Sequence, residues 1–175
     1  MSDDTPSRSS DPPVSLALES DESEEQHLVA VRERWWPRYA PILGELWESE
    51  APDRRGAIAF VLVGRERIHE MNMQFLNRDR PTDVLSFDLS DAPDEFEGEV
   101  YLCPEVATEQ AERAGVPFHE ELARLMVHGL LHLSGHDHHS PADGRRMAKA
   151  TRTWLGELFP DGATPSPDTQ QGAAS

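Results

Sequence analysis

The alternation of hydrophobic and polar positions along this chain predicts short strands separated by amphipathic helices. Alternating apolar side chains favour strands at Val14–Leu18 and Thr82–Leu89, and the continuous apolar run Ala57–Val63 favours a buried strand. A further strand, Glu99–Cys103, can pair antiparallel with Thr82–Leu89. The acidic residues 91–97 between these two strands are expected to form a mobile loop.

Apolar residues recur at helical spacing elsewhere in the chain. Helices are therefore expected at residues 24–47, 68–76, 104–115, 117–133 and 140–158. The first is expected to end or kink at Pro37, because proline removes a backbone donor and clashes with the preceding turn. Strands mixed irregularly with helices predict an α+β fold: a single domain with a small mixed β-sheet packed against helices, the metal-binding helix near the sheet.

The two ends of the chain differ in composition from its middle. Residues 1–13, rich in Asp, Ser and Pro, and residues 160–175 are predicted to be disordered tails around a folded domain at 14–159. The formal net charge is −17, and residues 1–25 alone carry eight acidic side chains against one arginine. A broad basic surface for nucleic acid is therefore excluded, so any RNA contact must use a local patch.

Cysteine usage and hydropathy indicate the compartment. The chain has one cysteine, Cys103, so no intramolecular disulfide can form, which fits a reducing cytosol. The longest purely apolar run, Ala57–Val63, is far shorter than the ~20 residues that a membrane-spanning helix needs. We expect a cytoplasmic protein with no membrane partner.

A cluster of histidines at residues 128–139 carries the candidate chemistry. His128 and His132 are four residues apart, so on a helix they share one face and can bind one metal ion. Gly135 is suited to a turn that ends this helix and brings His138 to the same point. Three neutral imidazoles leave a fourth position on zinc open, which is typical of a catalytic site rather than a structural one.

Several features of this cluster leave alternatives open. His136 or His139 could replace His138 as the third ligand, and imidazoles suit zinc, copper, iron and nickel alike. Asp137 either accepts a hydrogen bond from a ligand imidazole and so orients it, or caps the turn. The spacing of the three histidines is similar to that of the metzincin peptidases, but Gly129 stands where those enzymes carry the glutamate that acts as general base.

Two motifs together resemble the YbeY family of bacterial rRNA-maturation endoribonucleases. They are HGLLHLSGHDH at residues 128–138 and PTDVLSF at residues 81–87, in the family's order, and the resemblance extends from about residue 14 to about residue 159. His136 departs from the family pattern, which usually has tyrosine there. Leu76 departs further, because it replaces an arginine that the family is thought to use near its active site.

The resemblance implies a function, a cofactor and partners. It implies a single-strand-specific, zinc-dependent endoribonuclease with one Zn²⁺ per chain, held by His128, His132 and His138. The implied biology is maturation of the small-subunit rRNA 3′ end and ribosome quality control, with rRNA, the ribosome and ribosome-associated proteins as partners. Arg78 and Arg80 are candidate RNA contacts in place of the missing arginine.

Two other functions compete with the endoribonuclease. A non-catalytic metal-binding module that associates with the ribosome is favoured by the acidic charge and by Leu76. A metallopeptidase fits the ligand spacing, but Gly129 leaves it without the usual base. We rank the endoribonuclease first, the module second and the peptidase third.

Overall fold

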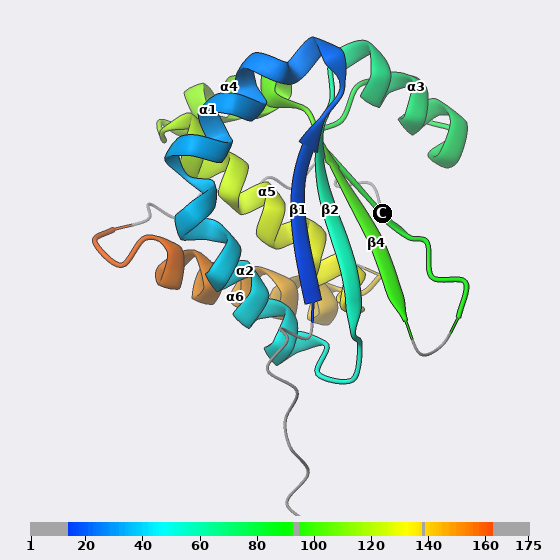
Figure 1. Ribbon diagram of the computed structural model, residues 1–175, viewed down its shortest axis with the longest axis vertical. Helices are drawn as coiled ribbons and strands as arrows, with labels where there is room; N and C mark the ends of the chain where they lie inside the picture. The colour runs from blue at the N-terminus through cyan, green and yellow to red at the C-terminus, as the bar shows by residue number, and fades with distance from the viewer. Residues whose placement is uncertain (1–13, 93–94, 138, 163–175) are drawn as a thin grey trace, which may run out of the picture.

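A four-stranded mixed sheet forms the centre of the computed structural model, which describes residues 14–92, 95–137 and 139–162 (Figure 1). Its strands are β1 (Val14–Ser20), β2 (Gly56–Leu62), β3 (Val84–Asp88) and β4 (Phe96–Leu102). Their order across the sheet is β1-β2-β4-β3; β1, β2 and β4 are parallel, and β3 is antiparallel to β4. The predicted α+β class and the antiparallel pair are confirmed.

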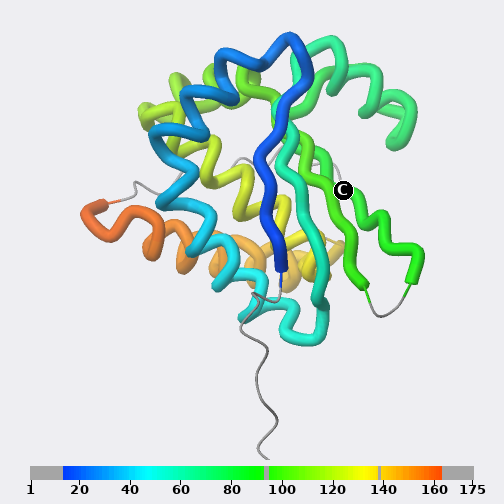
Figure 2. The backbone as a smooth tube through the Cα atoms, viewed as in Figure 1, coloured from blue at the N-terminus to red at the C-terminus, as the bar shows by residue number. Residues whose placement is uncertain are grey.

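The helices cover mainly one face of this sheet, as the backbone trace shows (Figure 2). They are α1 (Glu25–Arg34), α2 (Trp36–Glu50), α3 (Arg65–Leu76), α4 (Pro104–Ala114), α5 (Phe118–Leu133) and α6 (Pro141–Leu158). The short 3₁₀ turn η1 (Glu22–Glu24) precedes α1. The predicted break is present, because α1 ends before Trp35 and Pro37 lies in the first turn of α2, where its missing N–H is tolerated.

Helix α5 is the most enclosed element of the fold. It packs against β3 and β4 of the sheet and against α2, α4 and α6. Residues on all sides of it are buried, including Leu122, Leu125 and Leu130, which are at most 1% exposed. A helix that is apolar around its circumference is held by packing from every side, so α5 is a rigid mount for the side chains that it presents.

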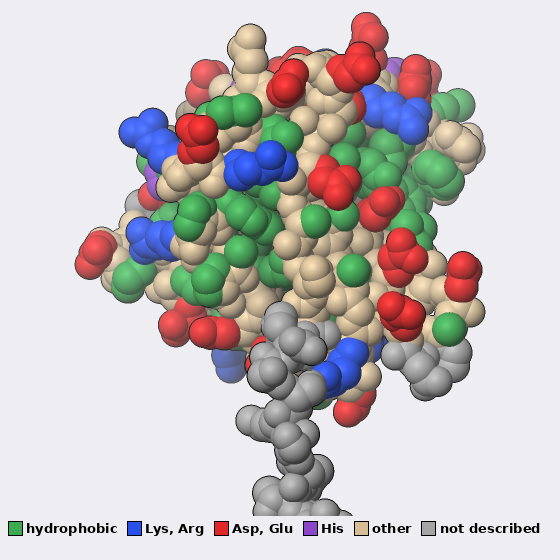
Figure 3. Space-filling view, in the orientation of Figure 1, with side chains coloured by type: hydrophobic (Ala, Val, Ile, Leu, Met, Phe, Trp, Pro, Cys, Tyr) green, Lys and Arg blue, Asp and Glu red, His purple; other side chains and the backbone are tan. Residues whose placement is uncertain are grey.

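The opposite face of the sheet is covered only in part. Helix α3 packs there through Ile68 and Met71, against Leu85 of β3. On this face, acidic side chains are more prominent than basic ones (Figure 3), in keeping with the net charge of −17. Within the described residues, no helix combines the length and the apolar character needed to cross a membrane.

The predicted boundary between the acidic loop and the strand that follows it is wrong. The acidic loop was expected to extend to Glu97, but β4 already begins at Phe96, which is only 5% exposed. Its ring packs 4.7 Å from the ring of Trp47, and this burial favours strand pairing over a loop. Residues 93–94 and most of the two predicted tails lie outside the described residues.

Candidate metal and RNA site

The two histidines predicted to share a helix face lie side by side on α5. The ring centroids of His128 and His132 are 4.7 Å apart, with their planes inclined at 75°. His128 is 9% exposed and His132 is half-buried, so one ring is enclosed by the fold while the other borders solvent. Neutral imidazoles at this separation are a donor pair that fits a single zinc ion.

The end of α5 has the turn that the sequence predicted. The helix ends at Leu133, and Gly135 adopts a φ of +106°, in the region that favours glycine. Backbone bonds close the turn, from Gly135 N to His132 O at 3.0 Å and from His136 N to Leu131 O at 2.9 Å. The predicted third ligand, His138, lies outside the described residues, and the described residues contain no group of three potential ligands.

The other two histidines of the cluster have carboxylate partners. His136 Nε2 lies 2.9 Å from Glu50 Oε2, and His139 Nε2 lies 2.7 Å from Asp137 Oδ2. His136 is partly buried, whereas the side chain of His139 is 87% exposed. Asp137 therefore contacts His139, which is not one of the three implied ligands, and both of its expected roles stay predictions.

Gly129 faces the sheet, and the structure shows why a larger residue is excluded there. A Cβ atom at this position would lie 2.4 Å from Cγ1 of Val100 and 3.2 Å from Oγ of Ser86. A glutamate in the metzincin arrangement would have to displace the buried Val100. The geometry therefore argues against the metallopeptidase alternative.

A buried ion pair precedes the histidines along α5. Arg124, one turn before His128, donates to both carboxylate oxygens of Glu121, with Nη2 2.6 Å from Oε1. Burial alone would lower the pKa of Arg124, but the hydrogen bonds to Glu121 and the nearby Asp83 raise it. The arginine stays charged beside the histidine pair, a position for which the sequence pattern gave no signal.

The loop at residues 77–83, between α3 and β3, carries the two predicted RNA contacts, Arg78 and Arg80. Asn77 ends α3 with a φ of +53°, and the side-chain amide of Asn72 donates to the carbonyl of Arg80 at 2.8 Å. Asp83, at the end of the loop, accepts a hydrogen bond from the side chain of Gln110 in α4.

The side chains of Arg78 and Arg80 have no ion pair with any described residue. Leu76 instead packs against the apolar cluster formed by Ile68, Met71 and Leu85. Arg78 is half-buried and Arg80 is exposed.

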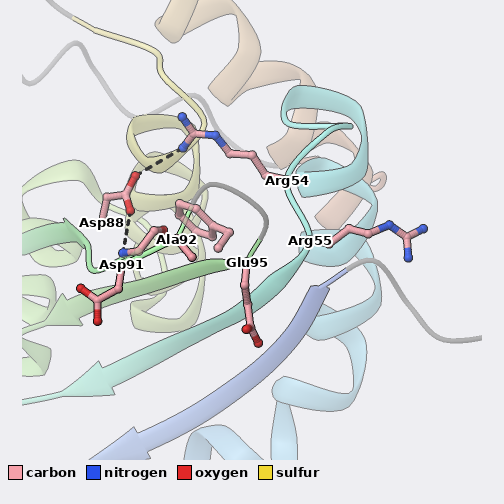
Figure 4. Close-up of a pocket in the computed structure, with 8 residues that line it drawn as sticks. Arg54, Arg55, Asp88, Asp91, Ala92 and Glu95 are labelled. Carbon is pink, nitrogen blue, oxygen red and sulfur yellow. Dashed lines mark hydrogen bonds and ion pairs between the residues drawn. The ribbon is translucent and has the colours of Figure 1, made fainter.

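A pocket of about 430 Å³ opens near the C-terminal end of α5. Arg54 and Arg55, from the connection between α2 and β2, line it together with residues of the β3–β4 connection (Figure 4). Arg54 points toward Asp88, with Nη1 3.5 Å from Oδ2, while Arg55 points away from it. The sequence did not indicate these residues, because nothing in its local pattern relates them to the histidines.

Comparisons with known proteins agree with this arrangement. The solution structure of TM1509 from Thermotoga maritima superposes with a TM-score of 0.55 and 29% identity, covering 84% of this chain and 91% of that one. Proteins named Endoribonuclease YbeY are 35% identical over 114 residues in Thermotoga maritima (64% of this chain, 75% of the relative) and 33% identical over 129 residues in Staphylococcus carnosus (69% and 84%). A third, from Carboxydothermus hydrogenoformans, is 42% identical over 106 residues (60% and 74%).

The fold and the paired histidines, taken with these relatives, define the class of this protein: an endoribonuclease, a hydrolase acting on RNA. The family model described as Endoribonuclease YbeY matches residues 21–158, which is most of the chain. The chain belongs to the endoribonuclease YbeY family, so the resemblance noted in its two motifs is confirmed.

Proposed function

We propose that this protein is a zinc-dependent, single-strand-specific endoribonuclease that matures the 3′ end of small-subunit rRNA and takes part in ribosome quality control. The observation that carries the proposal is the pair His128 and His132, with ring centroids 4.7 Å apart on the most enclosed helix of the fold. Family membership and the names of the relatives support RNA as the substrate.

In this proposal, one Zn²⁺ is held by His128, His132 and His138. When bound, zinc supplies a Lewis acid and a source of hydroxide at neutral pH. The packing of α5 holds the first two imidazoles in fixed orientations, which lowers the entropic cost of assembling the site. Asp137 is proposed either to orient a ligand imidazole or to cap the turn.

Arg78 and Arg80 are proposed to bind the phosphates of the RNA strand. Both precede β3, one of the two strands against which α5 packs, and neither forms an ion pair with a described carboxylate. Their charge gives an acidic protein a local patch for a polyanion. The ribosome or a ribosome-associated protein is the proposed partner that brings this enzyme to its substrate.

The test is cleavage of a small-subunit rRNA 3′-end precursor by zinc-loaded protein. We expect wild type to cut the precursor, and His132→Ala to fall to the level of a chelated sample. His138→Ala is expected to behave like His132→Ala. His139→Ala is the matched control and is expected to keep activity, since the side chain of His139 is 87% exposed.

The alternatives give different results. Cleavage that persists in His132→Ala would indicate a contaminating nuclease and remove the basis for the assignment. If His139→Ala loses activity while His138→Ala keeps it, His139 rather than His138 is the third zinc ligand. Tight zinc binding with no cleavage under any condition would favour the non-catalytic module.

A further inference from the structure

The last turn of α5 leaves backbone carbonyls without partners inside the helix, as every helix end does. The turn at Gly135 occupies two of them, since the carbonyls of Leu131 and His132 accept backbone bonds from it. The carbonyl of Leu133, the residue directly after His132, instead accepts from Nη1 of Arg54 at 2.9 Å. A guanidinium at a helix C-terminus is also favoured by the helix dipole.

Arg54 is itself held from several sides. Its guanidinium carbon lies 5.3 Å from the centroid of the Phe96 ring, and Nη1 lies 3.5 Å from Asp88 Oδ2 (Figure 4). The indole of Trp47 donates to the carbonyl of Arg54 at 3.0 Å. Through these contacts and its bond to Leu133, Arg54 connects four segments: the end of α2, the end of β3, the start of β4 and the end of α5.

Glu50 holds the other side of the same turn. One carboxylate oxygen lies 2.9 Å from Nε2 of His136, and the other accepts from the indole of Trp154 at 3.3 Å. His136 and Glu50 are both about three-quarters buried, with side chains 23% and 24% exposed. Because tyrosine is usual at this position in the family, the pairing of His136 with Glu50 is a feature of this chain's own residues.

We infer that Glu50 and Arg54 are positioning residues for the metal site. They contact both ends of the segment 133–136, which begins directly after His132 and determines the direction in which the chain leaves α5. Polar groups bonded directly to a metal ligand contribute about 10- to 100-fold to metal affinity, so residues that act through the adjoining turn are expected to contribute less. The inference rests on the proposed function, since it assumes that the histidines of α5 bind zinc.

The test measures zinc affinity by competition with a chromophoric chelator, together with the visible absorption spectrum of the Co²⁺-substituted protein. Arg54→Met and Glu50→Gln are each expected to weaken zinc binding by up to about 10-fold and to shift the cobalt spectrum. Arg54→Lys can still donate to the carbonyl of Leu133, so it is expected to retain more affinity than Arg54→Met. Glu48→Gln, an exposed change on the same helix, is the matched control and is expected to change neither.

Thermal unfolding of the zinc-free proteins separates positioning from loss of fold. If Arg54→Met does not fold, the zinc affinities of Arg54→Lys and Glu50→Gln test the positioning role instead. Variants that bind zinc as tightly as wild type, with an unchanged cobalt spectrum, would overturn the inference while leaving the proposed function intact. Wild type that binds no zinc would instead overturn both, and the two failures are thereby distinguishable.

His136→Phe provides a second check on the role of His136. If this residue acts through Glu50, His136→Phe and Glu50→Gln have similar effects on zinc affinity, and the double variant is no worse than either single one. A much larger loss in His136→Phe than in Glu50→Gln would show that His136 is itself a ligand, and the assignment of a positioning role would then fail.

Discussion

Leu76 occupies the position at which the YbeY family commonly has arginine. Its side chain packs against an apolar cluster that includes Ile68 and Leu85. Cationic side chains near this point come instead from Arg78 and Arg80, while Arg124 forms a buried pair with Glu121. Because a buried, doubly bonded guanidinium has little freedom to reach a ligand, the two loop arginines are the better candidates for binding phosphate.

Arg78→Ala and Arg80→Ala are each expected to weaken binding of a single-stranded RNA oligonucleotide in a sequence-independent way. Each should also reduce the slope of log K against log salt concentration by about 1, since one phosphate contact is lost. Fluorescence anisotropy of a labelled oligonucleotide over a range of salt concentrations measures both effects. Arg113→Ala, on the exposed surface of α4, is expected to leave the slope unchanged. If the slopes of Arg78→Ala and Arg80→Ala equal that of wild type, the loop does not bind RNA phosphates.

At the scale of elements, α5 depends on a close approach to the sheet. Gly129 lies in the middle of the helix, where glycine is less favourable than alanine by about 1 kcal/mol. The contact explains this choice, since Val100 on β4 occupies the space that a Cβ atom would need. Ser86 Oγ, on β3, also reaches the carbonyl of Gly129 at 3.4 Å. This contact fixes the distance between α5, which carries His128 and His132, and the sheet.

Gly129→Ala is expected to lower the free energy of unfolding by about 1–2 kcal/mol. Overpacking a core costs about 1–3 kcal/mol, and better helix propensity offsets part of that loss. Gly144→Ala in α6 is the matched control, because a Cβ atom there would have nothing within 4 Å. It should therefore stabilise the protein, by up to about 1 kcal/mol. Urea unfolding measures both; stabilisation by Gly129→Ala would contradict the close approach.

At the scale of the whole molecule, the hydroxyl groups of two tyrosines make the stability of the fold depend on pH. Tyr101, on the partly covered face of the sheet, donates to Glu99 Oε2 at 2.5 Å. Burial, followed by this hydrogen bond, raises the pKa of Tyr101 from its ordinary value of 10.0 to about 12. Burial also raises the pKa of Tyr39, whose hydroxyl lies 3.0 Å from Nδ1 of His119.

The contribution of these two tyrosines to stability is therefore expected to be constant below about pH 10. It should fall as the pH rises from there towards about 12. Over that range the unfolded chain releases its phenolic protons while the folded protein retains them, so alkali favours unfolding. The urea midpoint at about pH 11 should lie below that at about pH 9. Tyr101→Phe is expected to show a smaller difference between the two midpoints, and an identical difference would contradict the raised pKa.

Local patterns alone determined most elements of this protein and the core of its candidate site. The continuous apolar run at residues 57–63 predicted β2, helical spacing predicted α3, and Pro104 with Gly115 predicted the ends of α4. The pair His128 and His132 was predictable for the same reason, because a four-residue separation determines which side chains meet on a helix.

Only the tertiary structure decided which distant residues meet. Phe96 is a strand residue because Trp47 covers its ring, and no period near Phe96 contains that information. Arg54 bonds the carbonyl of Leu133 although 79 positions separate them, since packing of α2, β4 and α5 brings these segments together. Local sequence specifies conformation through spacing, whereas contacts between elements depend on the shape and burial of surfaces that exist only once the chain has folded.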